Sequence, residues 1–481
     1  MNDLFTALLE TYEQNQQIAG KEIDGVTLLP VSHEYRQAHI EITITADGAF
    51  HAAQVLKKEN IETIVPITIE SGSRSSAIAP HALCDTLSYV ASHAQLSSDK
   101  HTAYMEALNA WQSSKYSHPY VKAVYRYISG ESMLRDLSRS NILSFEKNGC
   151  FSDKKIYKAI PQQKAFVRFS IFDAGQVIPL YQNREVFNSW INYYESTLTD
   201  TGLCYLTGKK GPLTHIHPAG IRYAGDRARL ISANDRVGFT FRGRFSTSKD
   251  AVQMSYDASQ KIHSALKWLI RKTNYAFGED TVLVWCENGA NISNPYLGSV
   301  PMVGFPETEE EYNMAVSAYF RYQKAALLKK GVNTVHVAHV SAATKGRLSV
   351  PVFYSLPVLQ YLKNVETWFQ SCCWRMHVWN DKTKRMLHYV GSPELKEIIN
   401  LSLVTNPPFS NIPNEAKSSA LRTLSSSMIM GTPIDRAFVR KLMKNHTKSE
   451  YEPWFRNKIL DVGCAVIRKS RMESFGEEWS M

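Results

Sequence analysis

Eight basic residues lie between Gly202 and Phe245, and only Asp226 and Asp235 oppose them in that stretch. They are Lys209, Lys210, Arg222, Arg227, Arg229, Arg236, Arg242 and Arg244. Residues 236–245 alternate as a strand does, with phenylalanines set among the arginines. Arginine forks hold phosphate oxygens through paired hydrogen bonds, and aromatic rings stack on bases. The pattern favours nucleic-acid binding; the alternative is a hairpin with one core face and one solvated basic face.

A second candidate is the polar stretch from Glu70 to Ala77, which follows a predicted strand at 63–69. Between its ends stand Ser71, Gly72, Ser73, Arg74, Ser75 and Ser76. Side chains this small cannot build a core, Gly72 permits unusual backbone angles, and Arg74 stands among hydroxyl groups. Such a loop could present a cation and backbone N–H groups to a phosphate or to a groove of DNA. The alternative is an ordinary surface loop.

Three further features suggest catalysis or metal binding, and each is incomplete. The run Gly208-Lys209-Lys210-Gly211 lacks the glycine spacing of a phosphate-binding P-loop. His215 and His217 are two residues apart, so on a strand they would share one face and could both bind zinc, with Cys204 nearby. A third and fourth ligand at a familiar spacing are missing. Glu287 ends a predicted strand without a partner Asp, His or metal motif.

These gaps lead us to expect no catalytic residue, no metal and no cofactor. The competing class is a stand-alone nucleic-acid-processing enzyme, with a metal-dependent site assembled from residues distant in sequence. A third class is a purely structural protein, and strong salt-dependent binding of nucleic acid would count against it.

Composition sets the bounds for these sites. The chain has 481 residues, 44% of them hydrophobic, and a net charge of +10, so a folded protein with a polyanionic partner is favoured. Seven scattered cysteines without a C-x-x-C pair favour reduced thiols. The N-terminus lacks a signal-peptide pattern, and no stretch approaches the ~18 apolar residues of a membrane span. We therefore expect a cytoplasmic chain with no membrane partner.

The elements that must position the candidate residues mix strands with helices. Alternating apolar residues predict strands at 39–45, 164–172, 281–286, 332–340 and 348–353. Apolar residues at helical spacing predict helices at 100–143, 186–198, 248–274, 307–330, 357–376, 416–429, 433–444 and 454–469. The sequence therefore predicts an α+β fold with small sheets, long helices and a helical bundle at the end.

We expect three parts. An N-terminal α+β part at 1–155 carries the polar loop, and a central α+β part at 156–405 carries the basic stretch. A C-terminal helical bundle at 406–481 begins at the best linker candidate, the adjacent prolines 407 and 408.

Ordered pieces of the chain resemble the Cas8c (Csd1) family, the large subunit of the type I-C CRISPR surveillance complex (Cascade). The pieces are Ile78–Asp85, Cys204–Gly208, His217-Pro218, Ser232–Asn234, Thr281–Glu287, Ser341–Tyr354, and Leu421–Gly431 with Pro433. No single piece is diagnostic, but their order along most of the chain is.

The resemblance implies a non-enzymatic role at the 5′ end of a CRISPR RNA. Such a subunit sits beside the Cas5c and Cas7c backbone subunits, together with the Cas11c small subunit. It reads a short flanking motif (PAM) in double-stranded DNA, helps to open the duplex into an R-loop and recruits the Cas3 helicase-nuclease. Guide pairing supplies the sequence specificity in such complexes.

Residue roles within that function are expectations from local chemistry and position. We expect the Ser71–Ser76 loop, with Arg74 first, to read the motif. The residues expected to hold nucleic-acid backbone are Lys209, Lys210, Asn234, Arg242 and Arg244. Family members often continue into a helical part that resembles the small subunit, whereas this sequence stops at Met481. We therefore expect the small subunit to be a separate chain, or this version to be shortened.

Overall fold

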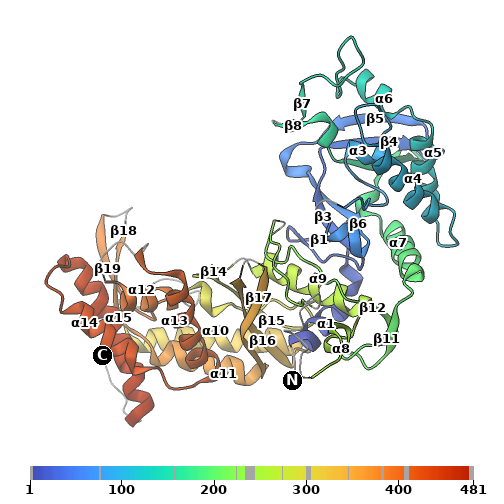
Figure 1. Cartoon of the computed structure of the whole chain (residues 1–481). Helices are drawn as coiled ribbons and strands as arrows, with labels where there is room; N and C mark the ends of the chain where they lie inside the picture. The colour runs from blue at the N-terminus through green and yellow to red at the C-terminus, as the bar shows by residue number, and fades with distance from the viewer. Residues whose placement is uncertain are drawn as a thin grey trace. The chain divides into compact units, whose positions relative to one another are not determined.

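The computed structural model describes residues 4–74, 77–156, 159–223, 225–232, 244–273, 275–298, 305–344, 346–380, 384–405 and 411–475 (Figure 1). The chain divides into two compact units. Residues 15–268 form one, here called the inserted unit. Residues 1–14 and 269–481 together form the other, here called the split unit. The boundaries predicted after residues 155 and 405 fall inside these units, and the three-part division stays a prediction.

The inserted unit mixes short helices with small sheets. Its strands are β1 (Glu22–Ile23), β2 (Val26–Thr27), β3 (His33–Gln37), β4 (Ile40–Thr45), β5 (Phe50–Val55), β6 (Glu62–Pro66), β7 (Lys155–Ile156), β8 (Ile160–Pro161), β9 (Val167–Asp173), β10 (Gln176–Pro179), β11 (Thr201–Leu203), β12 (Lys210–Thr214) and β13 (Met254–Ser255). Its α-helices are α2 (Ile69–Gly72), α3 (Leu87–Val90), α4 (Ser98–Gln112), α5 (Pro119–Ser129), α6 (Met133–Arg139), α7 (Arg184–Thr197), α8 (Ser248–Ala251) and most of α9 (Tyr256–Thr273). Short 3-10 turns are η1 (Gln16–Ile18), η2 (Lys58–Asn60), η3 (Gln162–Lys164) and η4 (Leu180–Gln182).

The principal sheet of the inserted unit has the order β10-β9-β4-β5. Strands β4 and β9 run parallel at its centre, in the register Ile42↔Phe169 and Glu41↔Arg168. Because side chains alternate along a strand, the isoleucines of β4 share one face, where Ile40, Ile42 and Ile44 are each 0% exposed. The other face carries polar side chains, among them the pair Glu41 and Arg168. The sheet therefore has an apolar core face and a polar face.

The turn between β4 and β5 depends on one glycine. Gly48 has a φ of +93°, and a Cβ there would lie 2.8 Å from the carbonyl oxygen of Ala123 in α5. Only glycine tolerates both conditions, because it lacks the clashing atom. The predicted strand and turn at 39–48 are thereby confirmed, and they fix α5 against the sheet.

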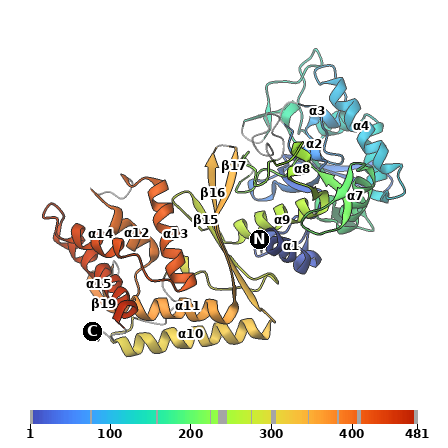
Figure 2. The same cartoon turned by 60° about the horizontal axis from the view of Figure 1, so that its bottom comes forward.

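The split unit combines a long-stranded sheet with a helical bundle (Figure 2). Its strands are β14 (Ala276–Phe277), β15 (Asp280–Trp285), β16 (Thr334–Thr344), β17 (Arg347–Pro357), β18 (Trp374–Asn380) and β19 (Arg385–Gly391). Its helices are α1 (Leu4–Asn15), α10 (Glu309–Lys329), α11 (Val358–Ser371), α12 (Leu395–Leu403), α13 (Asn414–Met430), α14 (Arg436–His446) and α15 (Pro453–Phe475), with a 3-10 turn η5 (Pro295–Leu297). The observed mixture of helices and small sheets confirms the predicted α+β class.

One apolar core joins the sheet and the helices of the split unit. It runs from Val282 and Val337 on the sheet, through Trp368 in α11, to Leu424 and Ile459 in the bundle. The N-terminal helix also belongs here, because the indole nitrogen of Trp285 donates to Thr11 Oγ1 at 3.0 Å. Helix α13 ends where Gly431 adopts the left-handed conformation, at a φ of +70°, which is a common way for a helix to stop.

Three predicted helical stretches differ from the structure. The stretch at 100–143 is divided into α4, α5 and α6. The helix predicted at 357–376 ends at Ser371, because Trp374 and Met376 instead pair with Gly391 and Tyr389 in the β18–β19 hairpin. Backbone pairing there overrides the helical spacing of the apolar residues. The helix predicted at 248–274 is interrupted at Met254–Ser255, which form β13 and pair with β12.

Candidate functional site

Lys209 and Lys210 stand at a tight turn between β11 and β12. Gly208, with a φ of +66°, lets the chain reverse, and its N–H donates to the carbonyl of Cys204 at 2.9 Å. The N–H of Cys204 in turn donates to the carbonyl of Lys209 at 2.9 Å. Both lysine side chains are exposed. The turn therefore exposes the ammonium groups of two consecutive lysines, and hydrogen bonds fix the main chain that carries them. Such an arrangement suits binding to the phosphates of nucleic acid.

The rest of the predicted backbone-binding set is only partly within the described residues. Arg244 is exposed, and its guanidinium lies 5.8 Å from the ring centroid of Phe245. Asn234, Arg242 and the predicted strand around them lie outside the described residues. Arg222 donates to both carboxylate oxygens of the buried Asp226, from Nε at 2.9 Å and from Nη2 at 3.2 Å. Its positive charge is therefore largely neutralised within the protein.

His215 and His217, considered above as zinc ligands, have protein partners instead. His217 is buried and its Nδ1 lies 2.9 Å from Ser259 Oγ, with the ring of His263 stacked at 6.0 Å. His215 Nε2 lies 3.2 Å from Asp200. Across the described part of the chain, no group of three or more His, Cys, Asp or Glu side chains is arranged to hold a metal ion.

Buried histidines make the inserted unit sensitive to acid. Burial lowers the pKa of His33 to about 4, of His217 to about 3 and of His263 to about 4. The unfolded chain, with ordinary histidine pKa values near 6.5, binds more protons than the folded unit between these limits. Above about pH 6.5 these histidines therefore cause no loss of stability. As the pH drops toward 4, the free energy of unfolding falls by up to about 1.4 kcal/mol per pH unit for each histidine.

We expect the melting temperature of the inserted unit to fall steeply between pH 6.5 and 5. Thermal melts at half-unit pH steps would measure this. His263→Gln should flatten the profile, whereas His51→Gln, at an exposed histidine, should leave its slope unchanged. An identical slope in all three proteins would contradict the assignment.

The polar stretch at 70–77 begins as a short helix, not as a loop. Thr68 caps α2 by accepting from the N–H of Ser71 at 3.1 Å, and the Ser71 hydroxyl accepts from the N–H of Thr68 at 2.9 Å. This reciprocal capping box fixes the backbone through Gly72, and Ser73 ends the helix. Ser71 is fully buried, so its hydroxyl is committed to the fold. Ser75 and Ser76 lie outside the described residues.

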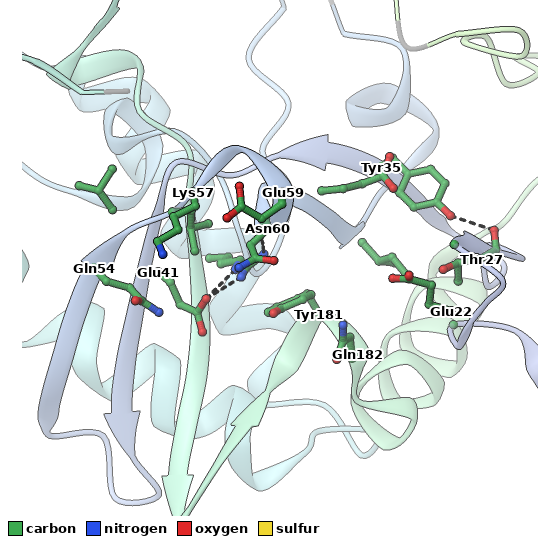
Figure 3. Close-up of a pocket in the computed structure, with 17 residues that line it drawn as sticks. Glu22, Thr27, Tyr35, Glu41, Gln54, Lys57, Glu59, Asn60, Tyr181 and Gln182 are labelled. Carbon is green, nitrogen blue, oxygen red and sulfur yellow. Dashed lines mark hydrogen bonds and ion pairs between the residues drawn. The ribbon is translucent and has the colours of Figure 1, made fainter. Parts of the chain in front are cut away.

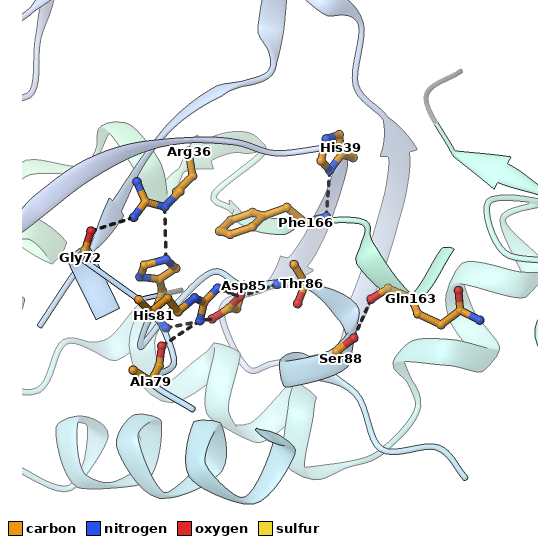
Figure 4. A network of polar contacts seen from close by, with 11 residues as sticks. Arg36, His39, Gly72, Ala79, His81, Asp85, Thr86, Ser88, Gln163 and Phe166 are labelled. Atoms are coloured by element: carbon orange, nitrogen blue, oxygen red, sulfur yellow. Dashed lines mark hydrogen bonds and ion pairs between the residues drawn. The ribbon is translucent and has the colours of Figure 1, made fainter. Parts of the chain in front are cut away.

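Arg74 clamps the two ends of the segment from 74 to 85 through Ala79 and Asp85, which Figure 4 labels. Its guanidinium donates to both carboxylate oxygens of Asp85 at 2.7 Å and to the carbonyl of Ala79 at 2.8 Å. Asp85 also accepts from the backbone N–H groups of His81 and Thr86 at 2.9 and 2.7 Å. Asp85 is 0% exposed and Arg74 is 19% exposed at the side chain. Arg74 is therefore bound inside the protein by Asp85 and Ala79.

A neutral histidine and a second arginine complete this network. Arg36 donates from Nε to His81 Nε2 at 3.3 Å and from Nη2 to the carbonyl of Gly72 at 3.5 Å. Burial, and then the charges of Arg36 and Arg74, hold the pKa of His81 well below its ordinary value. The sequence reasoning missed Asp85 as the partner of Arg74, although Asp85 closes the Ile78–Asp85 piece on which the family resemblance partly rests.

Comparison with known protein families identifies the family of the chain. The family model for the CRISPR-associated protein Csd1 (Cas_Csd1) matches residues 8–481, which is nearly the whole chain. The chain belongs to the Csd1 family. A search of curated proteins finds none that matches this Csd1 chain. Among its described residues, no helix is long and apolar enough to cross a membrane.

This Csd1 chain also holds a Ser–His–Asp arrangement in its split unit, which bears on the enzyme alternative. His339 Nε2 lies 3.1 Å from Ser425 Oγ, and its Nδ1 lies 3.1 Å from Asp280 Oδ2. All three residues are 0% exposed, and Ser425 Oγ also donates to the carbonyl of Leu421 at 2.7 Å. A nucleophile needs access to its substrate, so this buried arrangement suits packing between β15, β16 and α13 better than acyl transfer.

Asp280 is the charged centre of that arrangement. Arg422 donates to both of its oxygens, at 2.6 and 2.8 Å. Burial by itself raises the pKa of Asp280, but the hydrogen bonds from His339 and Arg422 reverse this and lower it to about 2. Asp280 is therefore ionised at neutral pH and depends on these partners. Glu287, which had no partner in the sequence, likewise lies 2.7 Å from His336 Nε2.

Proposed function

We propose that this Csd1 chain is the non-catalytic large subunit of a cytoplasmic type I-C CRISPR RNA-guided surveillance complex. In that role it recognises the PAM in double-stranded DNA, helps to unwind the target and recruits the Cas3 helicase-nuclease. Its assembly partners are the CRISPR RNA, the Cas5c and Cas7c backbone subunits and the Cas11c small subunit. The observation that carries the proposal is the family match over residues 8–481.

Two features of the inserted unit supply a physical route to DNA. The ion pair of Arg74 with Asp85 holds the segment from 74 to 85 at its two ends, and a few contacts from a short segment of this kind can enter a groove and separate base pairs. The Lys209–Lys210 turn offers exposed cations for the phosphate backbone. Arg74 contributes by holding this segment, because its guanidinium is already bound by Asp85.

The test is duplex binding by the chain assembled with CRISPR RNA and backbone subunits. Only the bases flanking the target are varied, and affinity is compared at two salt concentrations. We expect a strong dependence on the flanking bases. Absence of that dependence, or failure of the chain to join the guide complex, would favour the enzyme class and call for a metal-dependent nuclease screen.

Replacing both turn lysines, Lys209→Ala with Lys210→Ala, should weaken binding to every duplex sequence alike. If each lysine neutralises one phosphate, the slope of log K against log salt should become shallower by about 2. A salt titration measures this. Lys122→Ala with Lys147→Ala removes the same charge from two other exposed positions and serves as the matched control. An equal loss in the control would mean that net charge, and not this turn, is responsible.

A further inference from the structure

The inserted unit contains a cavity of about 790 Å³ that the proposed DNA role does not use (Figure 3). It opens between the polar face of the principal sheet and the walls formed by the β1–β2 hairpin, β6 and η4. The hairpin turns through Asp24 and Gly25, whose φ angles are +53° and +75°. Tyr35 Oη steadies it by donating to the carbonyl of Thr27 at 2.8 Å. The volume is within the usual range of ligand pockets, about 300–1,000 Å³.

The floor of the cavity is a buried ion pair between Arg168 and Glu41. Arg168 donates to Glu41 Oε2 from Nε at 3.0 Å and from Nη2 at 2.6 Å, and its Nη1 donates to the carbonyl of Asn60 at 2.8 Å. Ser170 Oγ donates to the other oxygen of Glu41 at 2.6 Å. Both charged residues are buried, at 3% and 7% exposure. The floor is therefore rigid and contributes no net charge.

An aromatic ring lies directly on this floor. The guanidinium carbon of Arg168 lies 3.8 Å from the ring centroid of Tyr181, which η4 supplies. The ring is only partly buried, and Figure 3 shows it between the two groups of polar side chains that line the cavity. An aromatic face of this kind attracts planar cations.

The remaining charges of the cavity are mostly negative. Apart from the neutral floor, the lining contains Glu22, Glu59 and Glu62 but only one cation, Lys57. All four side chains are exposed. This excess of carboxylates belongs to a chain whose net charge is +10. The cavity therefore differs in sign from the chain as a whole and opposes the entry of phosphate groups.

We infer that this cavity binds an arginine side chain from a partner protein. Carboxylates receive a guanidinium through charge-assisted hydrogen bonds, tyrosine accepts its flat face, and nearby amides such as Gln54 and Gln182 can accept its remaining N–H groups. A single-stranded nucleic acid is disfavoured, because its phosphates would approach three carboxylates.

The test uses the full chain and a fluorescein-labelled peptide, Gly-Gly-Arg-Gly-Arg-Gly-Gly, in fluorescence anisotropy. We expect saturable binding that is lost when citrulline, which is neutral but nearly isosteric, replaces both arginines. Glu22→Gln with Glu59→Gln should weaken binding about tenfold. These two glutamates are exposed, so the double variant should fold normally, which a thermal melt checks.

The matched control is Glu131→Gln with Glu146→Gln, which makes the same charge change at exposed positions outside the cavity lining. Binding in this control should stay within twofold of the parent protein. Equal weakening in both double variants would overturn the inference in favour of bulk charge. Displacement of the peptide by equimolar spermidine would assign the cavity to free polyamines instead. Competition by a 15-nucleotide single-stranded RNA, strengthened in Glu22→Gln with Glu59→Gln, would assign it to nucleic acid.

Discussion

Arg74→Ala is expected to destabilise the inserted unit by about 3 kcal/mol and to abolish flank-dependent DNA binding. The substitution leaves Asp85 buried at 0% exposure with only backbone N–H donors, and an unpaired buried charge is costly. Arg74 retains 19% exposure, so the value lies at the low end of the range for broken buried pairs. Chemical denaturation measures the first effect, and duplex binding measures the second.

Asp85→Asn separates a clamping role for Arg74 from direct base reading. If Arg74 clamps the segment, Asp85→Asn should lower stability and flank dependence much as Arg74→Ala does. The double variant should then be less unstable than the two single losses added together, because the pair is removed as a unit. If Arg74 instead contacts bases, Asp85→Asn should preserve flank dependence, and the clamp interpretation would be wrong.

Asp280→Asn is expected to destabilise the split unit by about 3 kcal/mol. The amide cannot satisfy Arg422 and His339 as the carboxylate does, because the substitution removes the negative charge that these two side chains share. Arg422 is 32% exposed at the side chain, so water relieves part of the cost. Urea denaturation followed by tryptophan fluorescence would measure the change.

Two companion variants give this prediction its controls. Asp280→Asn with Arg422→Met should recover part of the loss, because it removes the stranded cation as well. Ser425→Ala should cost only about 1 kcal/mol, the usual value of one hydrogen bond. A larger loss of stability in Ser425→Ala than in Asp280→Asn would contradict the view that the Asp280–Arg422 pair dominates this network.

The elements that local pattern dictates were predictable. The alternation at 39–45 predicts β4 because its isoleucines must share the core face, and Ile40, Ile42 and Ile44 are all fully buried. Elements that depend on distant pairing were not. Residues 374–376 carry apolar spacing that continues α11, yet their pairing with β19 makes them a strand. Nothing local to that segment encodes the hairpin partner.

The candidate site follows the same rule. The sequence shows Arg74 and the two turn lysines as cations near small residues, which is why we predicted that they bind nucleic acid. The structure shows that both lysines are exposed. Arg74 differs because Asp85, 11 residues later, occupies its guanidinium. The pairing of Glu287 with His336 spans 49 residues and was likewise invisible. Sequence spacing identifies which side chains carry charge, whereas three-dimensional pairing decides which charges remain available to a ligand.

Because the split unit is made of two chain segments, its two parts are synthesised at different times on the ribosome. Helix α1 is synthesised before the inserted unit, but its partner Trp285 emerges only after the whole inserted unit has been made. At about 5–20 residues per second, this delay is on the order of tens of seconds. During that time Leu8 and Tyr12, which are buried in the finished fold, lack the part of their own unit that follows residue 268. A nascent-chain chaperone that shields this helix would therefore have a defined window in which to act.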